Sequence, residues 1–196
     1  MTDASLATPF ADPVDDCQRS FRAVLRAMSR PGTVEALDAA GAPPPLGGAA
    51  WALCLTLADL ETPVWAAPEV DSPALRRSLS FHCGCPLAAE PGNAAFVLAD
   101  GATLPALDRL AVGTDESPER GATLIAQVAG FGGGRTLTLS GPGIRTTATL
   151  SVEGLDPALL PALADNRRLF PSGFDVVFAA PGAVAALPRT TLVEEA

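Results

Sequence analysis

The hexapeptide FHCGCP, residues 81–86, holds the single histidine of the chain next to two of its four cysteines. An imidazole beside a thiol is a pair that a nucleophilic enzyme or a metal site would use. A zinc site usually takes four ligands from two separated pairs, whereas His82, Cys83 and Cys85 lie within four residues. On an extended backbone, His82 and Cys83 would also point to opposite faces. The spacing therefore favours a scaffold turn without a metal, over a metal site or a catalytic pair.

A second candidate is LSGPGI, residues 139–144, where two glycines surround a proline after an expected strand. Gly141 and Gly143 would let successive amide groups point together and form a nest for an anion. Ser140 would add a hydroxyl donor and Arg145 a positive charge. A tight turn between two antiparallel strands explains the same spacing without a ligand. The spacing therefore favours a tight turn, and an anion site is the alternative interpretation.

Arginines next to hydroxyl side chains form a third kind of candidate. In LPRTT, residues 187–191, Arg189 and Thr190 could hold phosphate oxygens, as could the arginine of PERGAT, residues 118–123. The alternative is a surface arginine beside threonines that favour strands. Two further arginine clusters, at 19–30 and 166–168, fit acidic partners across an interface as well as they fit a ligand.

Composition excludes several classes of function. All 13 basic residues are arginine, so the chain has neither the lysine of a phosphate-binding P-loop nor the Schiff-base lysine of a pyridoxal phosphate enzyme. We therefore expect no pyridoxal phosphate cofactor. The net charge of −9 leaves no basic stripe for nucleic acid and disfavours anionic membranes.

Length and hydrophobic content point to one globular unit. The 196 residues, 48% of them hydrophobic, can bury a full core, and we expect a single domain over residues 1–196. No apolar run reaches the roughly 20 residues of a spanning helix, and the first residues lack a signal peptide's basic and apolar regions. The sequence therefore predicts a cytoplasmic protein with reduced thiols.

Apolar spacing predicts alternating helices and strands. In the first helix, Val14, Cys17, Phe21, Val24, Leu25 and Met28 share one face, which we expect to be buried. Residues 122–152 should form consecutive strands, with GFGGG (130–134) as the hairpin turn between the first two. The expected helices cover 12–30, 47–60, 72–81, 105–113 and 156–170, and the other expected strands cover 33–37, 62–67, 94–100 and 174–182.

This order of elements predicts an α/β fold. Helices and strands alternate in the first half, while strands follow one another in the second half. A mixed sheet with helices on both faces, in three layers, accommodates both halves.

Six stretches together resemble a known family. Their order and spacing are similar to those of the H subunit of the bacterial carbon–phosphorus lyase system, the PhnH family. The resemblance covers nearly the whole chain. The stretches are FR with MSRPG (21–22 and 28–32), FH (81–82), PERGAT (118–123), LSGPGI (139–144), FPSGFDVVF (170–178) and LPRTT (187–191).

The resemblance implies a role in phosphonate breakdown. The H subunit works with the G, I and L components to displace adenine from ATP with a phosphonate, giving a ribose 1-phosphonate 5-triphosphate. It also assembles with G, I and J and can form a homodimer. Its fold resembles that of pyridoxal phosphate transferases without the cofactor. The family offers no established catalytic residue to carry over, so the catalytic residues are unknown.

Two other functions stay open at this point. The chain could be a stand-alone hydrolase that uses Cys83 or Cys85 with His82. It could also be a non-catalytic protein that binds a small anion at LSGPGI.

Overall fold

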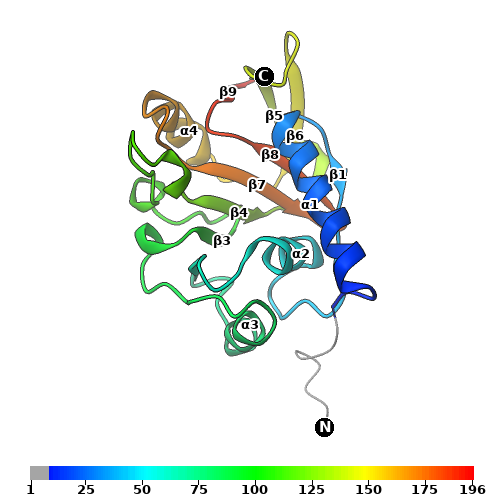
Figure 1. Cartoon of the computed structure of the whole chain (residues 1–196). Coiled ribbons are helices and arrows are strands. Elements are labelled where there is room, and N and C mark those ends of the chain that lie inside the picture. The colour runs from blue at the N-terminus through cyan, green and yellow to red at the C-terminus, as the bar shows by residue number, and fades with distance from the viewer. Residues whose placement is uncertain (1–8) are drawn as a thin grey trace.

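A six-stranded sheet forms the centre of the protein, whose computed structural model describes residues 9–196 (Figure 1). Strands β2, β3, β4 and β7 run parallel, β8 runs antiparallel to β7, and β1 runs antiparallel to β8. The mixed α/β sheet predicted from the sequence is thus confirmed. In spatial order, the strands are β1 (Glu35–Ala36), β8 (Ala183–Leu187), β7 (Asp175–Ala180), β4 (Thr123–Gln127), β3 (Phe96–Asp100) and β2 (Val64–Ala66).

A second, smaller sheet is antiparallel, and it shows that the expected hairpin is wrong. It contains β6 (Ala148–Glu153), β5 (Gly130–Ser140) and β9 (Leu192–Glu195) in that order. Strand β4 does not pair with β5, because β4 lies between β3 and β7 in the main sheet. The burial pattern explains the division. The centre of β4 is buried throughout, as parallel strands are, whereas burial alternates along β5.

The stretch GFGGG belongs to β5 instead of a turn between β4 and β5. Gly130 pairs with Glu153 of β6, and Phe131 and Arg135 both stand opposite Val152. The residues between Phe131 and Arg135 therefore bulge out of the ladder. Gly132 takes a φ of 97° within this bulge, a conformation that glycine adopts without strain.

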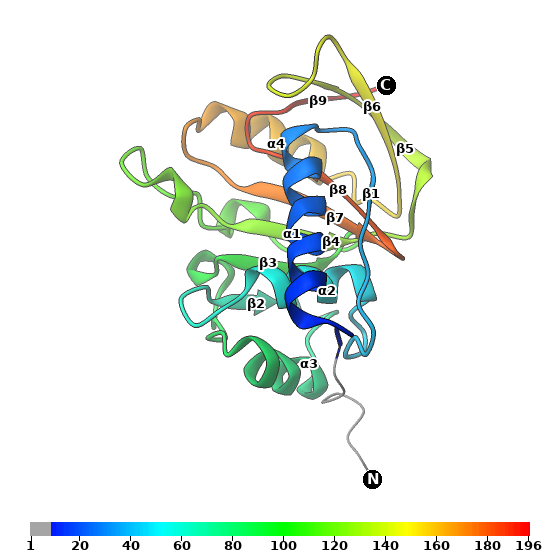
Figure 2. The same cartoon turned by 45° about the vertical axis from the view of Figure 1, so that its right-hand side comes forward.

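Two helices lie on one side of the main sheet, α1 (Pro13–Ser29) and α2 (Gly48–Leu57) (Figure 2). They pack against each other, α1 also against β8 and α2 against β7 and β4. The N-cap of α1 is Asp12, whose side chain accepts the amide hydrogens of Val14 and Asp15. Aspartate is one of the residues preferred at this position, and it lies at the start of the expected helix 12–30.

The buried face of α1 differs from the predicted one. Small side chains, including Ala23 and Ala27, face the protein and let the helix approach the sheet closely. The larger apolar side chains of Val14, Phe21 and Leu25 are 78%, 50% and 55% exposed. Of the six apolar residues expected to be buried, Val24 is buried, and Cys17 and Met28 are half-buried. The apolar stripe of α1 is thus largely a surface feature.

The remaining helices differ in extent from those that the sequence predicts. The Ser72 hydroxyl caps α3 (Pro73–Ser78) by accepting the Leu75 amide hydrogen, and a π-helical turn (Leu79–Cys83) continues it. Helix α4 (Leu159–Arg168) lies inside the expected range 156–170, and the Asp156 carboxylate before it accepts amide hydrogens from Ala158 and Leu104. Single 3₁₀ turns occupy Pro91–Asn93, Leu107–Arg109 and Pro118–Arg120. Within residues 9–196, no helix is both long and apolar enough to cross a bilayer.

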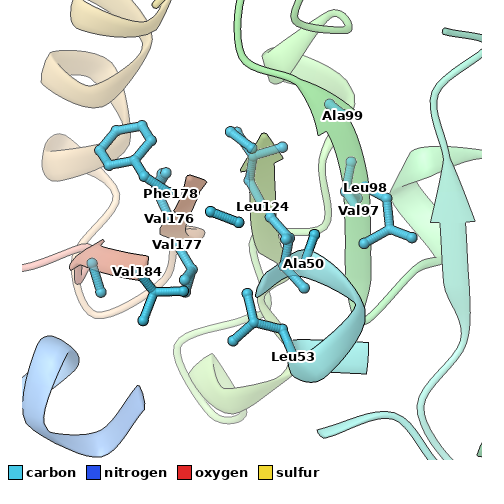
Figure 3. Packing of buried hydrophobic residues seen from close by; sticks show 14 of the residues in the cluster. Ala50, Leu53, Val97, Leu98, Ala99, Leu124, Val176, Val177, Phe178 and Val184 are labelled. Carbon is cyan, nitrogen blue, oxygen red and sulfur yellow. The ribbon is translucent and has the colours of Figure 1, made fainter. Parts of the chain in front are cut away.

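Buried aliphatic side chains join α2 to the strands (Figure 3). Val177 points to the side of Leu53 in α2, and Phe178, the next residue of β7, points to the opposite side.

Just before β7 begins, the buried side-chain amide of Asn166 accepts the N–H of Phe174 and donates to its carbonyl oxygen, each at 2.8 Å. The side chain thus replaces a strand partner for Phe174 and fixes α4 to the start of β7.

The end of α1 docks on the turn between β5 and β6. Gly143 in this turn has a φ of 83°, and a Cβ placed on it would lie 2.2 Å from the carbonyl oxygen of Ser29. A Cβ on Gly32 would lie 2.9 Å from the Cβ of Ala148. Glycine at both positions lets the chain after α1 lie directly against the small sheet.

We predict that Gly143→Ala lowers the free energy of unfolding by about 2–4 kcal/mol, because left-handed strain and a steric clash add together. Gly132→Ala is the matched control. Gly132 also has a positive φ, but no atom lies within 4 Å of its would-be Cβ, so strain alone should cost about 1 kcal/mol. Urea unfolding of the two variants checks this. Equal losses would show that α1 does not depend on the close approach.

Candidate functional site

The structure brings LSGPGI and LPRTT together. Ser140 pairs with Leu192 across β5 and β9. A Cβ on Gly141 would lie 3.0 Å from the carbonyl oxygen of Thr190. LSGPGI is the turn between antiparallel strands that the sequence favours. Arg145 is exposed on this turn. Four of the predicted site residues thus lie where the backbones of LSGPGI, LPRTT and the end of α1 touch. They are Ser140, Gly141, Gly143 and Thr190.

Arg189 lies in the most extensive polar contact among the predicted site residues. Its side chain is 13% exposed and forms an ion pair with Asp175, with Nη2 2.6 Å from Oδ2. The Nε atom also donates to the carboxylate, at 3.2 Å from each oxygen, and the backbone N–H of Arg189 donates to Oδ1 at 2.7 Å. The Nη1 atom donates to the carbonyl oxygen of Pro118 at 2.6 Å. One guanidinium therefore ties PERGAT, the start of β7 and LPRTT together.

The close approach of these three stretches also requires a glycine. A Cβ on Gly121 would lie 2.0 Å from the carbonyl oxygen of Gly173 and 2.8 Å from Nη1 of Arg189. The polar partner Asp175 was missed at the level of the sequence. Its only indication there is an acidic residue at the start of the apolar run DVVFAA.

These contacts lie at the amino ends of the parallel strands. Asp175 is the first residue of β7, and Thr123, in PERGAT, is the first of β4. In open α/β sheets, ligands bind at the carboxyl ends of the strands. The geometry around Arg189 is therefore that of a structural junction, and a ligand role for the predicted residues stays a prediction.

The carboxyl ends of β4 and β7 line one cavity, and a second cavity adjoins it. The smaller, of about 270 Å³, lies between the ends of β4 and β7 and the start of α2, with Gln127, Ala180 and Gly47 in its wall. The larger, of about 690 Å³, lies between α1 and the segment that contains β1. Asp38 and Gly182 belong to both walls.

We call the larger cavity the arginine cleft, because Arg19, Arg22 and Arg26 of α1 line it, with Asp16 and Asp38. Arg19 pairs with Asp16, and Nε of Arg26 lies 2.8 Å from Oε2 of Glu35. The sequence shows these arginines as a cluster in the first helix. The sequence does not show which cavity they line, because that depends on how α1 packs against the sheet.

FHCGCP lies apart from both regions, and one expectation about it is wrong. His82 and Cys83 are on a π-helical turn instead of an extended backbone. The helix ends at Gly84, in the left-handed conformation, and the chain then runs beside β2. The shape of the favoured reading, a helix end that turns through Gly84, is confirmed. That the stretch holds no metal and takes no part in catalysis stays a prediction.

Within residues 9–196, His82 and the thiols of FHCGCP do not bond one another as an acid and a base would. The ring of His82 meets Trp51 and Phe81 edge-on, with centroids 5.7 and 4.9 Å apart. The Cys83 thiol donates to the carbonyl oxygen of Cys54 at 3.5 Å. Burial raises the pKa of the Cys54 thiol, which keeps it protonated. Over residues 9–196, no three potential metal ligands of the His, Cys, Asp or Glu type come together.

Two comparisons with known proteins cover almost the entire chain. The family model for bacterial phosphonate metabolism protein (PhnH) matches residues 8–194. The alpha-D-ribose 1-methylphosphonate 5-triphosphate synthase subunit PhnH of Rhizobium meliloti (strain 1021) is 40% identical over 187 residues, 94% of each chain. A protein of Stutzerimonas stutzeri, provisionally named C-P lyase subunit protein HtxG, is 38% identical over 179 residues, 89% of this chain and 84% of its own.

The match spans the end of α1, both sheets and the Arg189 junction, so it includes all six stretches that resemble the family in the sequence. The chain belongs to the PhnH family of bacterial phosphonate metabolism proteins.

Proposed function

We propose that this chain is the H subunit of a carbon–phosphorus lyase system. In this role it is required with the G, I and L components to form ribose 1-phosphonate 5-triphosphate from ATP and a phosphonate, with release of adenine. The observation that carries the proposal is 40% identity, over 94% of both chains, to a relative named as a subunit of the corresponding methylphosphonate synthase.

The geometry favours a subunit over a stand-alone Cys/His hydrolase. The Cys83 thiol is bonded to a backbone carbonyl, and the His82 ring packs against two aromatic rings. A nucleophile and its base would need to bond each other instead. We propose that the chain also works without pyridoxal phosphate, whose Schiff base needs a lysine. Its fold would be a three-layer relative of the pyridoxal phosphate transferases, with α4 on the face to which Phe178 points.

Reconstitution tests the proposed function. We predict that a mixture of the G, I, L and H components releases adenine from ATP with methylphosphonate. Omission of this chain should abolish adenine release and the new phosphonate signal in ³¹P NMR. Product from the mixture without this chain would contradict the proposal. Product from this chain alone would favour a stand-alone enzyme.

We propose G, I and J as partners in the assembly, and a homodimer when the chain is isolated. The exposed stripe of Val14, Phe21 and Leu25 on α1 fits a second copy of the chain. The first turn of α1 is acidic, with Asp15 and Asp16, and the last turn carries Arg26. Two α1 helices packed antiparallel about a two-fold axis would place each acidic end beside the basic end of the other.

We predict that the isolated chain has twice its 19.9 kDa mass in light scattering, and that Leu25→Glu makes it a monomer. A charge that is buried in an apolar interface loses its hydration and gains no partner in return, so it opposes association. Leu60→Glu is the matched control, since Leu60 is 76% exposed and lies outside α1. A dimeric Leu25→Glu protein, or a monomeric unmodified chain, would refute this interface.

A further inference from the structure

The arginine cleft has a linear array of positive charge along one wall. Arg19, Arg22 and Arg26 follow one another at intervals of three and four residues, so they lie on one flank of α1. Seven residues of helix span about 10 Å, which is the distance between the first and the last arginine along the axis.

Most hydrogen-bond donors of this array are unused within residues 9–196. Arg22 has no hydrogen-bond or ion-pair partner in this part of the chain. Arg26 bonds Glu35 through Nε, which leaves both of its terminal nitrogens, and Arg19 uses Nη2 for Asp16. A guanidinium has five N–H donors and matches phosphate oxygens in pairs. The wall can therefore give several such bonds to one ligand.

The carboxylates of the cleft are already hydrogen-bonded. Asp16 accepts from Arg19 and, at 2.9 Å, from the Asp12 amide, while Asp38 accepts the Ala39 amide hydrogen at 3.0 Å. Glu35, just outside the lining, neutralises part of the charge of Arg26. The lining holds three arginines and two aspartates, and Glu35 brings the local charges into balance, so the cleft is less acidic than the whole chain, whose net charge is −9.

We propose that the arginine cleft binds a linear oligophosphate, the triphosphate arm of a nucleotide or sugar, with Arg22 as its principal contact. Arginines spread along two turns of helix match a triphosphate chain better than a single phosphate group, because each guanidinium can then bond a phosphate group of its own. The volume of about 690 Å³ leaves room for the group that carries the triphosphate. The physiological ligand, ATP or its ribosyl product, rests on the proposed function. The preference for a chain of phosphates rests on the cleft alone.

Calorimetric titrations of the full chain with inorganic triphosphate, ATP and inorganic phosphate test this site. We expect triphosphate and ATP to bind, and inorganic phosphate to bind at least about tenfold more weakly. Arg22→Ala should weaken triphosphate binding at least about tenfold, and Arg22→Lys should lose part of it because the planar fork is gone. The control is Arg168→Ala, an equal charge change at an exposed arginine of α4, which should leave binding unchanged.

Three results would overturn the site: no triphosphate binding at millimolar concentration, unchanged binding by Arg22→Ala, or equal weakening by Arg168→Ala. The reconstituted synthase separates this failure from that of the proposed function. Normal product formation with Arg22→Ala would contradict the proposed triphosphate site and leave the proposed function standing. Triphosphate binding that depends on Arg22, with no product from the complete mixture, would contradict the proposed function and leave the triphosphate site standing.

Discussion

The guanidinium of Arg189 holds together three segments that are far apart in the sequence. It binds the carboxylate that begins β7 and the carbonyl oxygen of Pro118, while the next residues of its own segment continue into the small sheet. Both charged side chains are largely buried, so each depends on the other for the hydration it has lost. A single polar junction therefore links the main sheet, the segment that leads into the small sheet, and the loop before β4.

The junction lies at the amino ends of the parallel strands, whereas the arginine cleft approaches their carboxyl ends at Gly182, in the turn after β7. At the amino end, glycines and Arg189 allow segments to touch, and the stretches typical of the family meet there. At the carboxyl end, the chain leaves cavities lined by arginine side chains and by strand ends. We infer that the rigid amino end keeps the strands in register and that the carboxyl end is available for a ligand. Sequence motifs alone do not separate these two roles.

The sequence predicts β3 and β7 well because both are continuous apolar runs, which is typical of buried parallel strands. It fails for the pairing of β5, because local alternation does not say which sheet a strand joins. It also fails for the buried face of α1, where alanines pack inward and Phe21 and Leu25 stay outside. The site residues share this limit: Arg189 can be identified as a candidate, but its partner Asp175 is set by long-range packing.

The measurement that tests this account most directly is the unfolding free energy of Arg189→Met compared with Arg168→Met. Arg168 also pairs with an aspartate, but both side chains of that pair are more than 70% exposed. We predict a loss of about 3 kcal/mol for Arg189→Met, because Asp175 is left without its partner, and a loss below about 1 kcal/mol for Arg168→Met. Equally small losses would contradict the structural role of the junction and return Arg189 to the candidates for ligand binding.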